Sequence, residues 1–132
     1  MRSRRFAFSL PALALALAIP MTAYAADEKG SEGRAKSIEV NAPSSDAYVQ
    51  FHGRLFVSSG KTTTEYRWGG TSCGSRTMTP EMVQLLVGAV KAEDVRIVPT
   101  FQDGQGTTKC LVGFSIKRSG GNGKGHDKDD PQ

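Results

Sequence analysis

The 132-residue sequence is poor in the residues that bind metals or act as nucleophiles, with only two cysteines and two histidines. Structural zinc sites use four Cys or His ligands at short, regular spacings. Cys73, Cys110 and His52 do not have such a spacing. His126 lies in the polar run G-H-D-K-D-D, which is typical of a solvated tail. The sequence therefore predicts no metal site and no cofactor.

Motifs for other chemistries are also missing. The glycine-rich stretch of the chain has no G-K-[ST], so it is not a nucleotide-binding P-loop. The carboxylates show no distinctive paired spacing of the kind used for acid–base catalysis. Beyond the N-terminus no segment is apolar enough to cross a bilayer. These absences favour a binding module over an enzyme.

Charge of neither sign dominates once the N-terminal segment is set aside. The chain has 17 Lys and Arg residues against 13 Asp and Glu. Three of the basic residues, Arg2, Arg4 and Arg5, lie in the first 25 positions, which leaves 14 basic against 13 acidic residues. Nucleic-acid binding needs a clustered basic stripe, so we expect no nucleic-acid partner.

The first 25 residues have the three parts of a secretory signal peptide. A basic start is followed by an apolar run over residues 6–19 and by the small-x-small site Ala23-Tyr24-Ala25. A membrane anchor is the alternative, but the run is short for a span of about 20 residues. No cysteine follows the run, which disfavours a lipoprotein. We expect cleavage after Ala25, export to the periplasm or beyond by the general secretory or twin-arginine route, and no stable membrane insertion afterwards.

Composition divides the remainder into three parts. Residues 26–46 mix charged residues with Gly and Ser, and residues 119–132 contain no apolar side chain. Segments that bury little apolar surface stay disordered. We therefore expect a flexible arm over 26–46, one small domain over 47–118 and a disordered polar tail over 119–132.

One helix is predicted from Pro80 to Lys91. Thr79 is a suitable N-cap, and Pro80 falls at the first helical position, where its missing N–H costs nothing. Apolar residues recur at intervals of three and four, which gives one apolar stripe. The helix should pack on a sheet, because a helix this short is marginal alone.

Four strands are predicted around this helix, over residues 48–57, 62–68, 95–101 and 109–117, from alternating apolar and polar residues. Pro99 indicates an edge position or a bulge in the third of them. The order is β-β-α-β-β. The sequence thus predicts an α+β fold, in which the helix covers one face of a small antiparallel sheet.

The two cysteines are expected to form a disulfide, because an exported protein reaches an oxidising compartment. A Cys73–Cys110 bond would fasten the entry of the helix to the last strand. The alternative to a structural disulfide is a thiol enzyme in which His52 activates Cys73 at a helix N-terminus. It needs a free thiol, which an exported pair of cysteines would seldom keep.

The glycine-rich loop that precedes the helix is the best candidate binding loop. Free amides near a helix start favour anions, and Arg76 adds a positive charge. The alternative is that the glycines only let the chain turn beside the disulfide. Aromatic and basic residues nearby could form a surface with it. The candidate loop residues are Gly69, Gly70, Thr71, Ser72, Ser75 and Arg76, and the candidate surface residues are Trp68, His52 and Arg54.

Three hypotheses for function follow. The first is a small exported, non-catalytic module that binds a protein or an envelope polymer. The second is a secreted inhibitor of a hydrolase such as a protease or lysozyme, since a preordered loop loses little entropy on docking. The third is the thiol enzyme.

Overall fold

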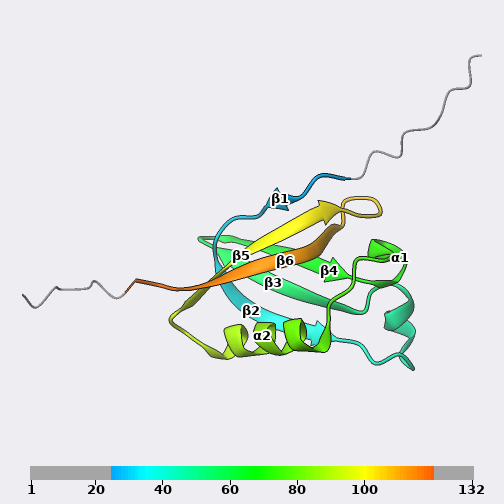
Figure 1. The fold of residues 1–132 in the computed structure, drawn as a ribbon, viewed down its shortest axis with the longest axis horizontal. Coiled ribbons are helices and arrows are strands. Elements are labelled where there is room, and N and C mark those ends of the chain that lie inside the picture. Colours follow the sequence, from blue (N-terminus) through cyan, green and yellow to red (C-terminus); the bar gives the residue numbers. More distant parts are fainter. Residues whose placement is uncertain (1–24, 121–132) are drawn as a thin grey trace, which may run out of the picture.

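The structure, a computed structural model, describes residues 25–120. Residues 1–24 of the expected signal peptide and most of the expected C-terminal tail lie outside these residues. Among residues 25–120, no helix combines the length and hydrophobicity needed to span a membrane. The elements are β1 (Glu28–Lys29), β2 (Arg34–Val40), the 3₁₀ helix η1 (Asp46–Val49), β3 (Gly53–Ser59), β4 (Thr62–Trp68), α1 (Gly70–Cys73), α2 (Pro80–Lys91), β5 (Val95–Asp103) and β6 (Lys109–Arg118) (Figure 1).

The predicted fold class is confirmed. The described chain is an α+β fold with one main helix, one disulfide and a single six-stranded sheet in the order β1-β5-β6-β4-β3-β2. The four strands and the helix expected from the sequence are present. The sheet differs from the prediction in two respects: it has two further strands, and it is mixed instead of purely antiparallel.

The segment expected to be a flexible arm, residues 26–46, instead supplies the two additional strands. β1 pairs with β5, and β2 pairs with β3 along its length. A bulge between Ala35 and Ser37 shifts the register. Because a bulge interrupts the two-residue period, Ala35 and Ile38 both face the core although they are three residues apart. The flexible-arm prediction was wrong because this bulge hides the strand pattern.

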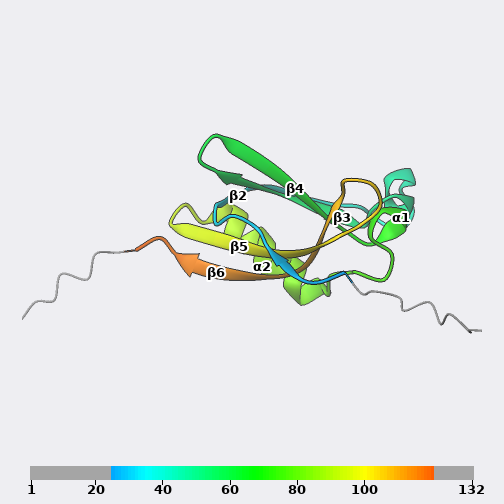
Figure 2. The same cartoon turned by 90° about the horizontal axis from the view of Figure 1, so that it is seen from above.

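The two edges of the sheet are formed by one continuous stretch of chain. β1 and β2 stand at opposite ends of the strand order, yet only residues 30–33 separate them. Gly30 N–H donates to the Pro99 carbonyl at 2.9 Å, and Gly33 exchanges hydrogen bonds with Ile97 at 3.0 and 2.8 Å. The N-terminal segment thus runs along β5 and then along β3. The sheet consequently curls back on itself, with β3 and β4 in one layer and β5 and β6 in another (Figure 2).

The strands β4 and β6 are parallel, and only Arg67 and Cys110 are in register between them. These two strands close the curled sheet into a barrel. Because they share so little register, the barrel is partly open at the seam between them. If β1 and β2 are counted as one strand, the result is a five-stranded barrel with α2 between the third and fourth strands. This connectivity corresponds to the partly open Greek-key barrel of the OB-fold.

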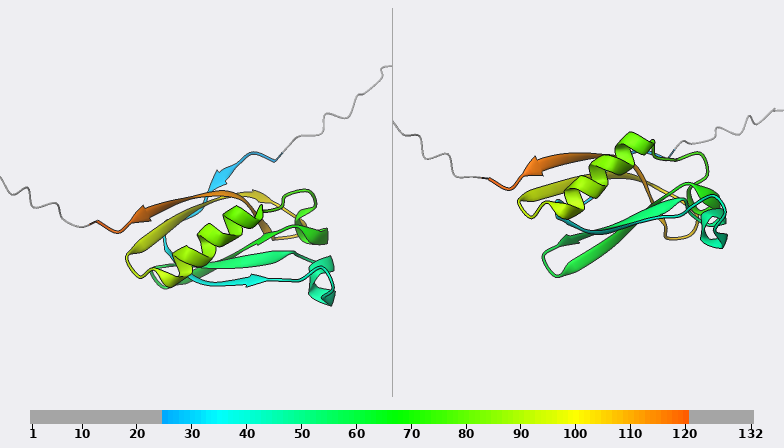
Figure 3. Two further views of the ribbon diagram at one scale, coloured as in Figure 1. Left: turned by 60° about the horizontal axis from the view of Figure 1, so that its bottom comes forward. Right: turned by 90° about the horizontal axis from the view of Figure 1, so that it is seen from below.

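The helix α2 begins and ends where the sequence predicts. The Thr79 hydroxyl accepts a hydrogen bond from Met82 N–H at 3.3 Å. Figure 3 shows α2 lying against one face of the curved sheet, with β2 on one side and β6 on the other. Leu86 and Ala89 are buried, whereas Leu85 is 57% exposed. The core beneath the helix is formed by Ala35, Leu55, Val57, Tyr66, Trp68, Leu86, Ala89, Ile97, Phe101 and Leu111.

Two strand details differ from the alternation expected. Val49 belongs to η1 and is 65% exposed, because the first predicted strand begins only at Gly53. In β6 the adjacent residues Cys110 and Leu111 are both buried, so burial does not alternate there as the sequence pattern predicts. The pairing skips Val112 opposite Thr100 and Phe101, and this bulge changes which side chains point inward. The extra residue lies in β6 and not in the strand of Pro99, which itself stays in register with Phe114.

Candidate functional site

The predicted disulfide is present and lies at the seam of the barrel. Cys73 at the end of α1 is bonded to Cys110 near the start of β6, and both are almost fully buried. Cys110 is also the residue in register with Arg67 of β4. The covalent bond therefore links the chain at the seam where only one residue pair of β4 and β6 is in register.

A reactive thiol at Cys73 is incompatible with this bond. Both cysteines of the chain are in the disulfide. The His52 ring stacks on Tyr48, with centroids 3.9 Å apart and planes 10° apart. Catalysis by Cys73 and His52 stays a prediction that would require reduction of the bond first.

The loop from Gly69 to Arg76 is tied into the fold by its own hydrogen bonds. The Gly69 amide donates to the Arg76 carbonyl at 2.6 Å, and the Ser72 amide donates to the Gln50 carbonyl at 3.0 Å. The Arg76 side chain donates to the carbonyls of Cys73 at 2.8 Å and Asp103 at 2.7 Å. These donors are engaged within the chain, so the contacts favour the structural interpretation of the loop over anion binding.

The glycines of the loop meet a conformational requirement. Gly69, Gly70 and Gly74 have φ values of 69°, 65° and 59°, a region that side chains other than hydrogen disfavour. They let the chain leave β4, form α1 and reach the disulfide. Thr71 and Ser75 remain exposed at its surface.

The three candidate surface residues do not form one surface. Trp68 and His52 line a pocket of about 440 Å³ between the segment 40–52 and α2. Arg54 lies on the outer face of β3, with other partners. Strict alternation from residue 52 to 54 would place His52 and Arg54 together, but β3 starts only at Gly53. The pocket has no Asp, Glu, Lys or Arg in its lining, so it suits a neutral, largely apolar group such as one side chain of a partner.

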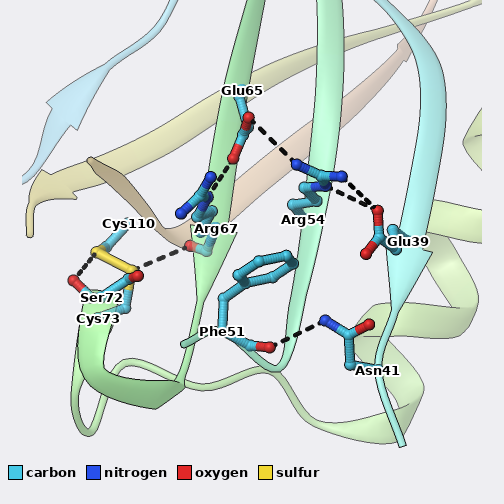
Figure 4. Close-up of polar contacts among 9 residues, drawn as sticks. All are labelled: Glu39, Asn41, Phe51, Arg54, Glu65, Arg67, Ser72, Cys73 and Cys110. Carbon is cyan, nitrogen blue, oxygen red and sulfur yellow. Dashed lines mark hydrogen bonds and ion pairs between the residues drawn. A yellow bond between two sulfur atoms is a disulfide. The ribbon is translucent and has the colours of Figure 1, made fainter. Parts of the chain in front are cut away.

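The outer face of β2, β3 and β4 carries a chain of ion pairs, here called the Arg–Glu ladder and defined as Glu39, Arg54, Glu65 and Arg67 (Figure 4). Arg54 bonds Glu39 through Nε at 2.8 Å and Nη2 at 2.7 Å, and its Nη1 lies 3.7 Å from Glu65. Arg67 Nε donates to the other oxygen of Glu65. Each of these side chains is partly exposed, so the ladder forms part of the surface.

An aromatic ring lies beneath the ladder. The Phe51 centroid is 5.2 Å from the guanidinium carbon of Arg54 and 4.7 Å from that of Arg67. A second ring, Phe56, is 5.2 Å from Arg54. Cations held over ring faces are attracted by the ring quadrupole. The rings and ion pairs together fix the two guanidinium groups in position.

A polar cleft of about 480 Å³ adjoins the ladder, between β4 and the turn that precedes β6. We call it the threonine cleft. Lys109 stands at its edge, with Nζ 4.4 Å from the Phe101 centroid. The cleft offers hydroxyl groups that both donate and accept hydrogen bonds. Its lining is Thr63, Thr64, Glu65, Arg67, Thr107, Thr108 and Lys109.

Most of this surface was not predicted from the sequence, although part of it was detectable there. In T-T-T-E-Y-R-W the period of two places Glu65 and Arg67 on one face and Tyr66 and Trp68 on the other. The pairing of Arg54 with Arg67 across β3 and β4, and of Glu39 with Arg54 across β2 and β3, depends on strand register. That register required β2, which the sequence did not reveal.

The residues that the structure describes hold no group of three or more His, Cys, Asp or Glu side chains that could bind a metal ion. His126 lies outside the described residues. Comparison of the chain with protein-family models, with curated proteins and with solved structures gives no match. The functional proposal therefore rests on the geometry of the surface.

Proposed function

We propose that this protein is an exported, non-catalytic binding module that holds a glycan chain of the cell envelope across the outer face of β3 and β4. The observation that carries the proposal is the Arg–Glu ladder beside the threonine cleft. Sugar hydroxyls donate and accept hydrogen bonds at once. The surface offers matching acceptors on Glu65, donors on Arg67 and hydroxyls on the cleft threonines.

Fold-level analogy supports the same face. In OB-type barrels the face of the second and third strands, with the loops that flank it, binds oligonucleotides and oligosaccharides. Here those strands are β3 and β4, and one flanking loop, residues 104–108, borders the threonine cleft. Analogy of fold does not by itself define a ligand, so the choice between sugar and nucleic acid has to come from the side chains.

The charges of the face favour a sugar over a nucleic acid. Nucleic-acid affinity comes largely from cations that neutralise phosphates. In this protein Arg54 is paired with both Glu39 and Glu65, and Arg67 is paired with Glu65. A phosphate chain would have to compete with these carboxylates and lie beside them.

Export supports an envelope ligand. The first 25 residues have the pattern of a signal peptide, and the buried Cys73–Cys110 bond suits an oxidising compartment outside the cytoplasm. A module delivered there meets the glycans of the envelope.

The test is isothermal titration calorimetry of the purified protein with soluble peptidoglycan fragments. We expect saturable binding that Arg67→Gln weakens about tenfold or more, since a hydrogen bond to a charged group contributes about 1.5–3 kcal/mol. Thr63→Val, which removes one hydroxyl of the cleft, should also weaken it. Lys91→Gln is the matched control, because it removes a cation on α2, away from the ladder and the cleft.

Absence of binding to the fragments, or equal affinity of Arg67→Gln and Lys91→Gln, would overturn the proposal. Tight binding of a single-stranded DNA oligomer at physiological salt would contradict the exclusion of nucleic acid. Inhibition of a lysozyme or protease panel that is lost on mutation of the exposed Thr71 or Ser75 would instead establish the hydrolase inhibitor.

A further inference from the structure

The solvent-facing side of α2 carries an exposed apolar side chain, where a surface helix usually has polar residues. Leu85 is 57% exposed, and Ile116 of the neighbouring strand β6 is 40% exposed. Between them runs a groove of about 690 Å³, which Gly88 and Val95 also line. Apolar side chains at the rim of an open groove indicate a contact surface.

Gly88 is a second, independent indication that this side of α2 is a contact surface. It lies in the interior of α2 and is exposed, and a Cβ added there would have no neighbour within 4 Å. Glycine at such a position costs about 1 kcal/mol relative to alanine. No close contact within the described chain requires it. A glycine on an outer helix face does, however, let the backbone of another helix approach closely.

The charges of the same face identify which helix fits. Glu81 is in the first turn and Lys91 in the last turn of α2. Neither takes part in an ion pair among residues 25–120. With 3.6 residues per turn, Glu81, Gln84, Gly88 and Lys91 follow one line along the helix. A second α2 lying antiparallel on this line would place each Glu81 opposite the other's Lys91.

We propose that α2 docks antiparallel against α2 of a second copy of this chain, related by a two-fold axis. A two-fold contact uses the same patch on both copies, so the patch must be self-complementary. The antiparallel arrangement meets this condition for charge. It also brings the two Leu85 side chains together beside Ile116, and it sets Gln84 of each copy over Gly88 of the other. This dimer does not involve the ladder or the threonine cleft, so it is independent of glycan binding.

The size of the contact sets the strength expected. One short helix pair with a rim of strand residues belongs to the small interfaces, below about 1,200 Å², which are typical of weak association. The monomer–dimer equilibrium should therefore appear at high protein concentration. Sedimentation velocity between about 10 μM and 1 mM, at low ionic strength, is the appropriate measurement, because salt screens the Glu81–Lys91 attraction.

The decisive variant is Gly88→Leu. The leucine fits the open space above the helix and has better helix propensity than glycine, so the protein should fold with equal or higher stability. It should nevertheless sediment as a monomer at concentrations where the wild type is dimeric. Thr71→Leu, at another exposed position, is the control for added apolar surface and should leave the dimer intact.

Charge exchange gives a test that does not depend on packing. Glu81→Lys and Lys91→Glu should each weaken the dimer by placing like charges opposite each other. The double variant should recover at least half of the wild-type association, because the pairs are restored with reversed sign. A monomeric wild type at 1 mM would overturn the proposal, as would a dimer that Gly88→Leu and both single charge variants leave unchanged.

Discussion

Gly53, the first residue of β3, lies directly against the ring of Trp68. A Cβ at this position would overlap the indole and would also crowd the Glu39 carbonyl. We expect Gly53→Ala to lower the free energy of unfolding by about 1–3 kcal/mol, which is the usual cost of overpacking a core. Urea unfolding followed by tryptophan fluorescence measures it.

Gly113→Ala is the matched control for Gly53→Ala. It also lies in a strand, but the nearest atom to its added Cβ would be Thr100 Cβ at 3.8 Å, an ordinary contact. We expect the control to change stability by less than about 0.5 kcal/mol. If the two variants are equally stable, the tight approach of Gly53 to Trp68 is incorrect.

Tyr66, a core residue, makes the stability of the fold depend on pH. Burial raises the pKa of its phenol above the ordinary value of about 10, and a hydrogen bond with Thr64 acts in the opposite direction. Because the folded-state pKa is the higher one, the neutral phenol contributes its full stabilisation below about pH 10. That contribution is lost as the pH rises through the folded-state pKa.

We therefore expect the free energy of unfolding to fall above about pH 10, and to fall less steeply in Tyr66→Phe. Urea unfolding at a series of pH values from 8 to 11 tests this. Tyr48→Phe, at a half-buried position outside the core, should keep the wild-type slope. A Tyr66→Phe slope equal to the wild-type slope would remove Tyr66 as the cause.

At the scale of elements, α2 was the most predictable part of the chain, since its cap, first residue and apolar stripe all point to the same boundaries. Thr79→Ala removes the hydroxyl that accepts from Met82 N–H and should cost about 1 kcal/mol of stability. Thr77→Ala, at an exposed residue just before the helix, should cost far less. Thermal unfolding followed by circular dichroism would show a similar change in both variants if the cap contributes nothing.

The N-terminal strands were the least predictable part. The sequence over residues 34–40 has few apolar residues, and its bulge breaks their alternation. β1 is only two residues long and is held by pairing with β5. Such segments become strands because of a distant partner, and a local pattern carries no information about that partner.

The candidate site likewise has a part that could be predicted from the sequence and a part that could not. The disulfide could be predicted because the chain has only two cysteines and an expected oxidising destination. The side chains of Glu65 and Arg67 could be placed on one face from their spacing. Their connection to Arg54 and Glu39 could not, because it depends on the register of three strands. The structural role of Arg76 was also hidden, since its acceptor on Asp103 is 27 residues away.

For the molecule as a whole, the Cys73–Cys110 bond spans a separation of 37 residues and closes the open seam of the barrel. Such a cross-link stabilises mainly by restricting the unfolded chain, by about 3–4 kcal/mol for a loop of this length. We expect the Cys73→Ala, Cys110→Ala double variant to lose about this much stability in urea. Unfolding curves that coincide with those of the oxidised wild type would show that the bond contributes little.

The proposal that a glycan binds across β3 and β4 is tested most directly by a residue-resolved titration. Amide chemical shifts of the ¹⁵N-labelled protein would be followed as soluble peptidoglycan fragments are added. We predict saturable shifts confined to residues 63–67, to residues 104–109 and to the parts of β2 and β3 that carry Glu39 and Arg54. Shifts that are absent, or that map instead to α2 and the loop 69–76, would contradict it.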